Sequence, residues 1–138
     1  MDPRIEEGLN GRSFIDITTT GRQTGQPRRI EIAIHRFDGR YFISGSPSRR
    51  KRAWIANLET NPRMTVHIKA GPTPVDLPAT ARVIDGEAER RAIMPRVAAN
   101  WRRTDVDVMV AYSPLIEVTL DADAPASAAT AEGATQAR

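Results

Sequence analysis

A strict alternation of apolar and polar residues constrains this chain more than any other feature. It runs over residues 28–37 (RRIEIAIHRF), where the isoleucines share one face of an extended chain, and it predicts a half-buried strand. Asp38-Gly39 follows, a dipeptide typical of tight hairpin turns, and residues 40–46 (RYFISGS) predict the returning strand. The chain is therefore expected to contain an antiparallel hairpin with one face packed on a core.

Four more stretches predict strands, and two predict helices. The strands are expected at residues 14–20, 63–69, 79–84 and 115–120, with a loop over 70–78 (AGPTPVDLP). The helices are expected at 49–60, capped by Ser48, and from Gly86–Glu87 onward, capped by Asp85 and kinked or restarted at Pro95. Six strands with short connections and two or three short helices indicate an α+β domain, built as a barrel or a strongly curled antiparallel sheet.

Length and composition point to one domain. We expect an N-terminal segment over residues 1–12, a domain over 13–121, and a disordered tail over 122–138, whose small polar residues bury too little apolar area to order the chain. No apolar run reaches the length of about 18 residues that a membrane span needs. The sequence has no cysteine and no visible apolar leader, which fits a cytoplasmic protein.

Two basic clusters suggest an anionic ligand. Residues 48–52 (SRRKR) lie at an expected helix start, where cations are unfavourable unless an anion also binds there. The turn at residues 18–29 (TTTGRQTGQPRR) combines three arginines with glycines that leave backbone N–H groups accessible. Solvated surface is the plain alternative for each cluster. Two clusters, each beside a backbone anion site, favour a phosphate-bearing ligand.

The order and spacing of four segments resemble a known family. They are TTTGRQTGQPRR, FDGRYFISGS, WIANLETNPRMTVHI and ATARVIDGEAERRAIMPRV, which together lie within residues 14–98. They resemble the deazaflavin-dependent nitroreductase family, whose members use coenzyme F420 and have the split β-barrel fold of flavin-binding oxidoreductases. The resemblance implies a six-stranded antiparallel split β-barrel.

The resemblance also implies a set of cofactor-binding residues. The cofactor's phosphate and acidic tail would contact Arg22, Thr24, Gly25, Arg28 and Arg29, with Arg50 and Lys51 opposite. Ser44 and Ser46 would lie near the deazaflavin ring, and Trp54 would pack at its edge, although Trp54 is equally expected as a core anchor. Asn57 is expected to fix its helix to the neighbouring loop.

The activity implied is hydride transfer from reduced F420 to an electron-poor small molecule such as a quinone, an enone or a nitro compound. Tyr112 is the candidate catalytic residue, because a phenol can supply a proton after hydride transfer. Two alternatives stay open: an oxidoreductase of the same fold that uses FMN, and a non-enzymatic binder of a flavin, haem or lipid.

Three further expectations concern partners and metals. A nucleic-acid partner is disfavoured, because only 5% of the residues are aromatic and most of these fall at expected core positions. A homodimer is expected, since an open barrel of this size leaves a strand edge to cover. We expect no metal site and no acid–base role for His35 or His67, and solvated side chains for the arginines at 82, 90, 91 and 96.

Overall fold

The computed structural model describes residues 12–69 and 74–121. The strands are β1 (Arg12–Thr20), β2 (Pro27–Phe37), β3 (Arg40–Ser44), β4 (Arg63–Ile68), β5 (Val75–Val83) and β6 (Leu115–Leu120). The helices are α2 (Ala53–Thr60), α3 (Glu87–Trp101) and α4 (Val106–Tyr112). These elements confirm the predicted α+β fold. Residues 1–11 of the expected N-terminal segment and the expected tail at 122–138 lie outside the described residues.

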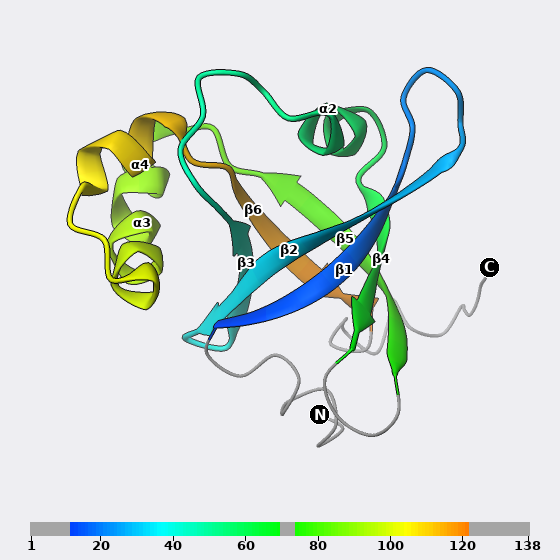
Figure 1. Cartoon of the computed structure of the whole chain (residues 1–138), viewed down its shortest axis with the longest axis horizontal. Helices are drawn as coiled ribbons and strands as arrows, with labels where there is room; N and C mark the ends of the chain where they lie inside the picture. Colours follow the sequence, from blue (N-terminus) through cyan, green and yellow to red (C-terminus); the bar gives the residue numbers. More distant parts are fainter. Residues whose placement is uncertain (1–11, 70–73, 122–138) are drawn as a thin grey trace.

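The six strands close into an antiparallel barrel in the order β1-β2-β3-β6-β5-β4 (Figure 1). Each strand therefore has two neighbours, and the closing pair joins β1 to β4 over a short register that centres on Ile17 opposite Val66. The predicted barrel is confirmed, but its open edge is not. The edge argument for a homodimer was therefore wrong, because strand pairing within one chain already covers each edge.

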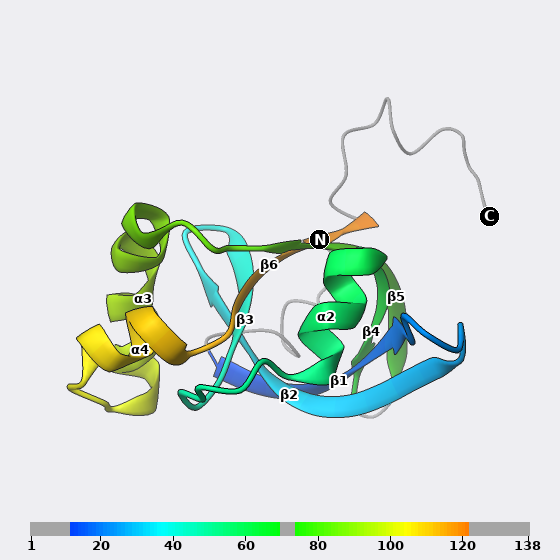
Figure 2. The same cartoon turned by 90° about the horizontal axis from the view of Figure 1, so that it is seen from above.

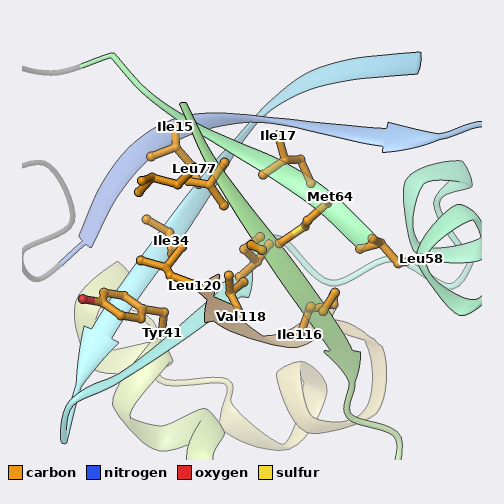
Figure 3. Packing of buried hydrophobic residues seen from close by; sticks show 14 of the residues in the cluster. Ile15, Ile17, Ile34, Tyr41, Leu58, Met64, Leu77, Ile116, Val118 and Leu120 are labelled. Atoms are coloured by element: carbon orange, nitrogen blue, oxygen red, sulfur yellow. The ribbon is translucent and has the colours of Figure 1, made fainter. Parts of the chain in front are cut away.

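The barrel interior is filled by the inward-facing residues of every strand (Figure 3). Ile15, Ile34 and Ile116 are wholly buried there, as the alternating sequence pattern predicts. Helix α2 lies across one end of the barrel (Figure 2). Its Leu58 joins the same apolar cluster (Figure 3). The strands thus make the wall, and α2 closes one end of it.

A second core lies outside the barrel, on the side that α3 and α4 cover (Figure 1). Met94 of α3 and Met109 of α4 are wholly buried against Phe42, whose side chain points outward from β3. Both faces of β3 are therefore apolar and covered. This second core fixes the position of α4 relative to the barrel, which matters for the site described below.

Helix α2 begins at Ala53, four residues later than predicted. Its N-cap is Arg52, which makes no capping hydrogen bond through its side chain. The Ser48 hydroxyl instead accepts a hydrogen bond from the Arg50 amide and donates one to the Arg50 carbonyl. Cations are unfavourable in a first helical turn, so the run of basic residues stays in a loop before the helix.

Two other boundaries also differ from the prediction. Strand β5 begins at Val75 rather than at 79, and Pro78 is accommodated because it lies in the part of β5 that pairs only with β4. Helix α3 is capped by Gly86 rather than Asp85, and it continues through Pro95 without a break. Pro95 has no N–H group, so the carbonyl of Arg91 accepts no hydrogen bond from it within the helix. Both residues are exposed to water, which can bond to that carbonyl instead.

The described helices include none that is both long enough and apolar enough to cross a bilayer.

Candidate functional site

Two cavities lie on either side of the start of α2. One has a volume of about 270 Å³ and lies between α2 and the β1–β2 turn; we call it the turn pocket, and it is lined by Gly21–Thr24, Arg28, Ile30, Ala53, Trp54 and Asn57. The other has a volume of about 390 Å³ and lies between α2 and the C-terminal end of α4; we call it the α4 cavity. Residues 48–52, just before α2, line the α4 cavity. Ala53 and Trp54, at the start of α2, line the turn pocket.

The β1–β2 turn is held by its own backbone. The Gly21 amide donates to the Gln26 carbonyl at 2.8 Å, and the Gly25 amide donates to the Gly21 carbonyl at 2.8 Å. Gly25 has a φ of +73°, a conformation that favours glycine. The two glycine amides are therefore used inside the turn, contrary to the expectation that they face a ligand.

Two other amides of the turn remain accessible. Those of Gln23 and Thr24 donate to no acceptor in the part of the chain that the structure describes. The Thr24 hydroxyl accepts a hydrogen bond from the Gln26 amide at 3.1 Å, so it stabilises the turn. Successive free amides beside a cavity are the backbone arrangement that binds anions.

Asn57 joins the turn to α2, as the sequence predicted. Its Oδ1 accepts hydrogen bonds from the Arg22 amide at 3.0 Å and from the Arg22 guanidinium at 3.4 Å. Its Nδ2 donates to the Thr19 hydroxyl at 3.1 Å, and the side chain is buried. This buried amide fixes the width of the turn pocket, because it ties one wall directly to the other.

The turn pocket gathers positive charge without a carboxylate. Arg22 and Arg28 line it together with Trp54, and no Asp or Glu is among its described lining residues. Trp54 is only 8% exposed and also belongs to the barrel core, so it serves as an anchor and as a pocket wall. The first amides of α2 have no acceptor within the helix, and Ala53 and Trp54 place that end of the helix at the pocket.

Arg29 does not join this group. Successive residues of a strand point to opposite faces, so Arg28 points toward the pocket and Arg29 points to the outer barrel wall. There its Nε donates to Asp16 at 2.9 Å. Lys69 also binds Asp16, and the two cations together lower the pKa of that carboxyl, with Lys69 contributing more. The strand alternation thus separates two adjacent arginines that the sequence pattern had grouped.

The α4 cavity has mixed charges and an apolar floor. The floor is formed by Ile55, Val83, Ile84, Pro114, Leu115 and Ile116. Arg50 and Lys51 line it, but Lys51 is paired with Glu59 through contacts of 2.9 and 3.0 Å, and this pairing raises the lysine pKa. Arg52 donates to the Ser46 carbonyl at 2.8 Å. Lys51 and Arg52 of the basic run are therefore already bound to other groups of the protein.

Tyr112 forms the rim of the α4 cavity. Its ring lies beneath the Arg49 guanidinium, 5.0 Å from the ring centroid, and its side chain is 40% exposed. The Ser48 amide donates to the Tyr112 carbonyl at 3.0 Å. Its hydroxyl makes no hydrogen bond to any residue within 12–69 or 74–121. Tyr112 is therefore held by its backbone at the edge of the cavity, and its hydroxyl has no partner among the described residues.

Arg90 is the functional-site residue that the sequence analysis missed. It was expected to be solvated, but its Nε donates to Val110 at 2.7 Å, its Nη1 to Ile84 at 2.9 Å, and its Nη2 to Met109 at 3.3 Å, all through carbonyl oxygens. A further bond joins it to the Ser113 carbonyl. Burial lowers the pKa of Arg90. This guanidinium holds the C-terminal end of α4 and thereby the wall that carries Tyr112.

The two serines proposed to lie near the ring are separated. Ser44 is wholly buried, and its hydroxyl donates to the Pro114 carbonyl at 2.6 Å. Ser46 is exposed and lines a smaller cavity of about 160 Å³ with Gly45, Trp101 and Arg103. Neither serine is among the residues that line the turn pocket or the α4 cavity.

The histidines lie away from both cavities. His35 is wholly buried beneath α3, where Nδ1 faces the Asn100 side-chain amide at 3.0 Å, and burial lowers its pKa to about 4. His67 lies on the outer barrel wall with Thr18 at 2.6 Å and Asp76 at 2.8 Å. No cluster of three or more potential metal ligands occurs among the residues described.

Comparison with known proteins identifies the family. The sequence of residues 2–133 matches the family described as F420H(2)-dependent quinone reductase. A solved F420-H2 dependent reductase, FDR-A, superposes with a TM-score of 0.58 at 22% identity, over 80% of this chain and 97% of the other.

Two other solved structures share the fold. A proposed 5-nitroimidazole antibiotic resistance protein from Bacteroides thetaiotaomicron gives a TM-score of 0.67 at 12% identity, over 88% of this chain and 80% of the other. The haem storage protein HutZ from Vibrio cholerae gives a TM-score of 0.63 at 17% identity, over 86% of this chain and 89% of the other. Because one fold serves such different ligands, the family match rather than the fold decides the cofactor. The chain belongs to the F420H2-dependent quinone reductase family, whose enzymes transfer a hydride from F420H2 to quinone-like substrates.

Proposed function

We propose that this protein binds the anionic tail of F420 in the turn pocket and reduces a quinone-like acceptor at the α4 cavity. The observation that supports this division is the contrast in charge between the two cavities. The turn pocket presents Arg22 and Arg28 without a carboxylate among its described residues, whereas the α4 cavity places two carboxylates, Glu59 and Asp85, among its basic residues and has an aliphatic floor. Cations without a nearby carboxylate suit a polyanion, and an aliphatic floor suits a ring.

The donor set of the turn pocket fits a phosphate. Two guanidiniums, the free amides of Gln23 and Thr24, and the positive end of α2 all lie around it. Charge-assisted hydrogen bonds of this kind are roughly twice as strong as neutral ones. Thr24 and Gly25 act indirectly in this proposal, because they keep the turn in the shape that presents the amides.

The α4 cavity fits a planar ring and an acceptor. Its volume of about 390 Å³ lies within the usual range of ligand cavities, and its floor is built from aliphatic side chains. Apolar walls exclude water, which protects a reactive hydride donor from side reactions. Arg50 lies at this cavity rather than at the turn pocket, so we assign it to the ring side of the cofactor.

Proton delivery is assigned to Tyr112. When bound, reduced F420 supplies the hydride, and a quinone that accepts it needs one proton to become the hydroquinone. Tyr112 lines the cavity, and water can return the proton afterwards because the residue is 40% exposed. Arg49 above the ring favours the phenolate that forms when the proton leaves.

Replacement of Tyr112 by Phe tests this assignment. The phenylalanine keeps the ring beneath Arg49 but removes the proton, so kcat for quinone reduction should fall by 10²-fold or more. The dissociation constant of F420 should stay within about twofold. Single-turnover oxidation of bound F420H2, followed by absorbance, is the measurement. An unchanged rate would show that solvent supplies the proton directly.

We also propose a cytoplasmic homodimer. A solved relative described as a domain-swapped dimer, which is 21% identical over 83% of this chain and 90% of its own, supports the assembly. The absence of cysteine from the sequence supports the compartment. Sedimentation equilibrium of the full chain tests the dimer, and a single species of 15.2 kDa would contradict it.

A further inference from the structure

Three side chains on the outer wall of the barrel form a hydrogen-bonded row across three strands. Thr18 comes from β1, His67 from β4 and Asp76 from β5, and β4 lies between the other two (Figure 1). The Thr18 hydroxyl lies 2.6 Å from Nε2 of His67, and Nδ1 of His67 lies 2.8 Å from Oδ1 of Asp76. A hydroxyl, an imidazole and a carboxylate in this order activate the nucleophile of many acyl-transfer enzymes. We call these three residues the wall triad.

The hydrogen bonds of the wall triad fix which nitrogen of His67 carries hydrogen. An ionised carboxylate can only accept a hydrogen bond, so Nδ1 donates to Asp76. In the uncharged imidazole Nε2 is then the acceptor, and the Thr18 hydroxyl donates to it. Only 10% of the His67 side chain is exposed, so the ring is also held by packing. Nε2 is therefore placed to take the proton when the Thr18 oxygen attacks a carbonyl carbon.

The strand register places a cation on the other side of Thr18. Residues two apart in a strand share a face, so Arg63, Thr65 and His67 all point outward from β4. Thr18 pairs with Thr65, which lies midway between the other two along β4. The Thr18 side chain thus has a base toward one end of β4 and a guanidinium toward the other.

Thr18 also lines a cavity of about 300 Å³, which we call the wall cavity. Two prolines and Arg63 are among the other residues that line it. Arg63 donates to Thr80 at 3.2 Å and to Asp121 at 3.1 Å. These bonds use two of its five N–H donors, so three have no acceptor among the residues described and can bind a ligand. The wall cavity shares no described lining residue with the turn pocket or the α4 cavity.

We propose that the wall triad hydrolyses esters of short carboxylic acids, a second activity that needs no cofactor. The Thr18 oxygen attacks the ester carbonyl carbon while Nε2 of His67 takes the hydroxyl proton. Negative charge develops on the carbonyl oxygen, where the guanidinium of Arg63 stabilises it. The bond between the carbonyl carbon and the alcohol oxygen then breaks, and His67 returns the proton to the leaving alkoxide. Water repeats these steps on the acyl-threonine, which releases the carboxylic acid and restores the Thr18 hydroxyl.

The fold rather than the sequence indicates this role for His67. From the sequence we expected no acid–base role for it. Its two partners lie 49 and nine residues away along the chain. Closure of the barrel between β1 and β4 brings the hydroxyl to the ring, and pairing of β4 with β5 brings the carboxylate.

The surroundings of the wall triad define the substrate class. A volume of about 300 Å³ lies at the lower end of the range for ligand cavities, which suits a short acyl group. The Asp76 side chain is 69% exposed, so water weakens its effect on the imidazole. Such a triad suits an ester with a good leaving group, and p-nitrophenyl acetate is the probe that we choose.

Hydrolysis of p-nitrophenyl acetate by the full chain without cofactor is the first measurement. Thr18→Val removes the hydroxyl but keeps the shape of the side chain, so it should reduce the rate to that of the uncatalysed reaction. His67→Gln should lower kcat/KM by about 10²-fold or more. Thr20→Val is the matched control, because Thr20 lies on the same face of β1 and lines the same cavity but is not bonded to His67. Its kcat/KM should stay within about twofold of the wild type.

A fluorophosphonate probe separates catalysis from a purely structural role of the wall triad. An activated hydroxyl displaces fluoride from this probe and forms a P–O bond. Peptide mapping by mass spectrometry should find the label on Thr18 of the wild type and of Thr20→Val, and little label on His67→Gln. Thr18→Ser should also take up the label, because it keeps the hydroxyl.

Two results would overturn the inference. One is a wild-type protein that takes up no label and hydrolyses no ester, while Thr18→Val has a lower melting temperature; the triad would then only join the strands. The other is equal hydrolysis by the wild type and Thr18→Val. The assays contain no F420, so their outcome is independent of the proposed reductase function.

Discussion

At the scale of single residues, the direction of a side chain decides its role. Arg28 and Arg29 are adjacent in sequence, yet one lines the turn pocket and the other binds Asp16 on the outer wall. The sequence pattern already predicts this separation, because successive residues of a strand face opposite sides. Arg28 lies on the same side as the inward-facing isoleucines of β2, and Arg29 lies on the other. Arg90 likewise falls in the buried stripe of α3, since Ile93, Met94 and Val97 follow it at helical spacing.

Other residue roles could not be predicted from the sequence. Nothing local indicates that Lys51 pairs with Glu59, or that Arg90 meets the carbonyl of Val110 twenty residues further along the chain. The first contact depends on the path of the loop before α2, and the second depends on how α4 packs against α3, so neither follows from the local sequence. Asn57 was predicted to fix its helix to the neighbouring loop, and its side chain does so by bonding to Arg22 and Thr19.

The buried His35 predicts a pH dependence of stability. Its folded pKa of about 4 lies below the ordinary value of 6.5, chiefly through burial and secondarily through the charge of Arg12, so the unfolded chain binds the proton more tightly. Stability is fully present above pH 6.5 and is lost as the pH falls toward 4. The free energy of unfolding should be about 2 kcal/mol lower at pH 5 than at pH 7.

Urea denaturation at the two pH values measures this difference. His35→Gln is the control, because it cannot titrate and should flatten the dependence over this range. The carboxyl groups of Asp16, Glu89, Asp105 and Glu117 have pKa values lowered by their cationic neighbours, and their ordinary values already lie below pH 5. An equally steep dependence in the glutamine variant would assign the effect to another group.

At the scale of elements, α2 is the least conventional part of the structure. It is eight residues long, follows a basic loop, and has Arg52 as its N-cap without a capping side chain. The sequence predicted the helix because Trp54 and Leu58 lie four apart, but not its start, because Ser48 resembled a cap and instead stabilises the loop. A helix start that lacks a capping side chain and follows basic residues is less stable by itself. Such a start is expected where an anion binds to the helix N-terminus.

Replacement of Arg52 by Asp tests the cost of this helix start. Its φ of −75° and ψ of 145° suit a capping residue, so Arg52→Asp should raise the free energy of unfolding by about 1 kcal/mol. It should also weaken F420 binding tenfold or more, because it places a negative charge between the two cavities. Arg50→Asp is the control, since it makes the same charge change two residues earlier and cannot cap the helix. Calorimetry and titration measure both effects, and lower stability in Arg52→Asp alone would contradict this view of α2.

At the scale of the whole molecule, the closed barrel places α2 between two cavities of different character. The strands and their sequence order were predictable, because alternation and turn residues identify each strand locally. Closure was not, since the pairing of β1 with β4 spans only residues 16–18 and carries no local signal. The position of the α4 cavity depends on that closure and on the second core, which joins segments far apart in the chain.

The central claim is that the turn pocket binds the anionic tail of F420, and the most direct test is the dissociation constant of F420 for Arg28→Ala and Arg29→Ala. Calorimetric titration at low and high salt is the measurement. A charge-assisted hydrogen bond contributes about 1.5–3 kcal/mol, so Arg28→Ala should weaken binding roughly 10- to 150-fold and reduce its salt dependence. Arg29→Ala, which alters the adjacent residue on the opposite face, should stay within twofold of the wild type. Equal losses in the two variants, or no loss in Arg28→Ala, would contradict the account.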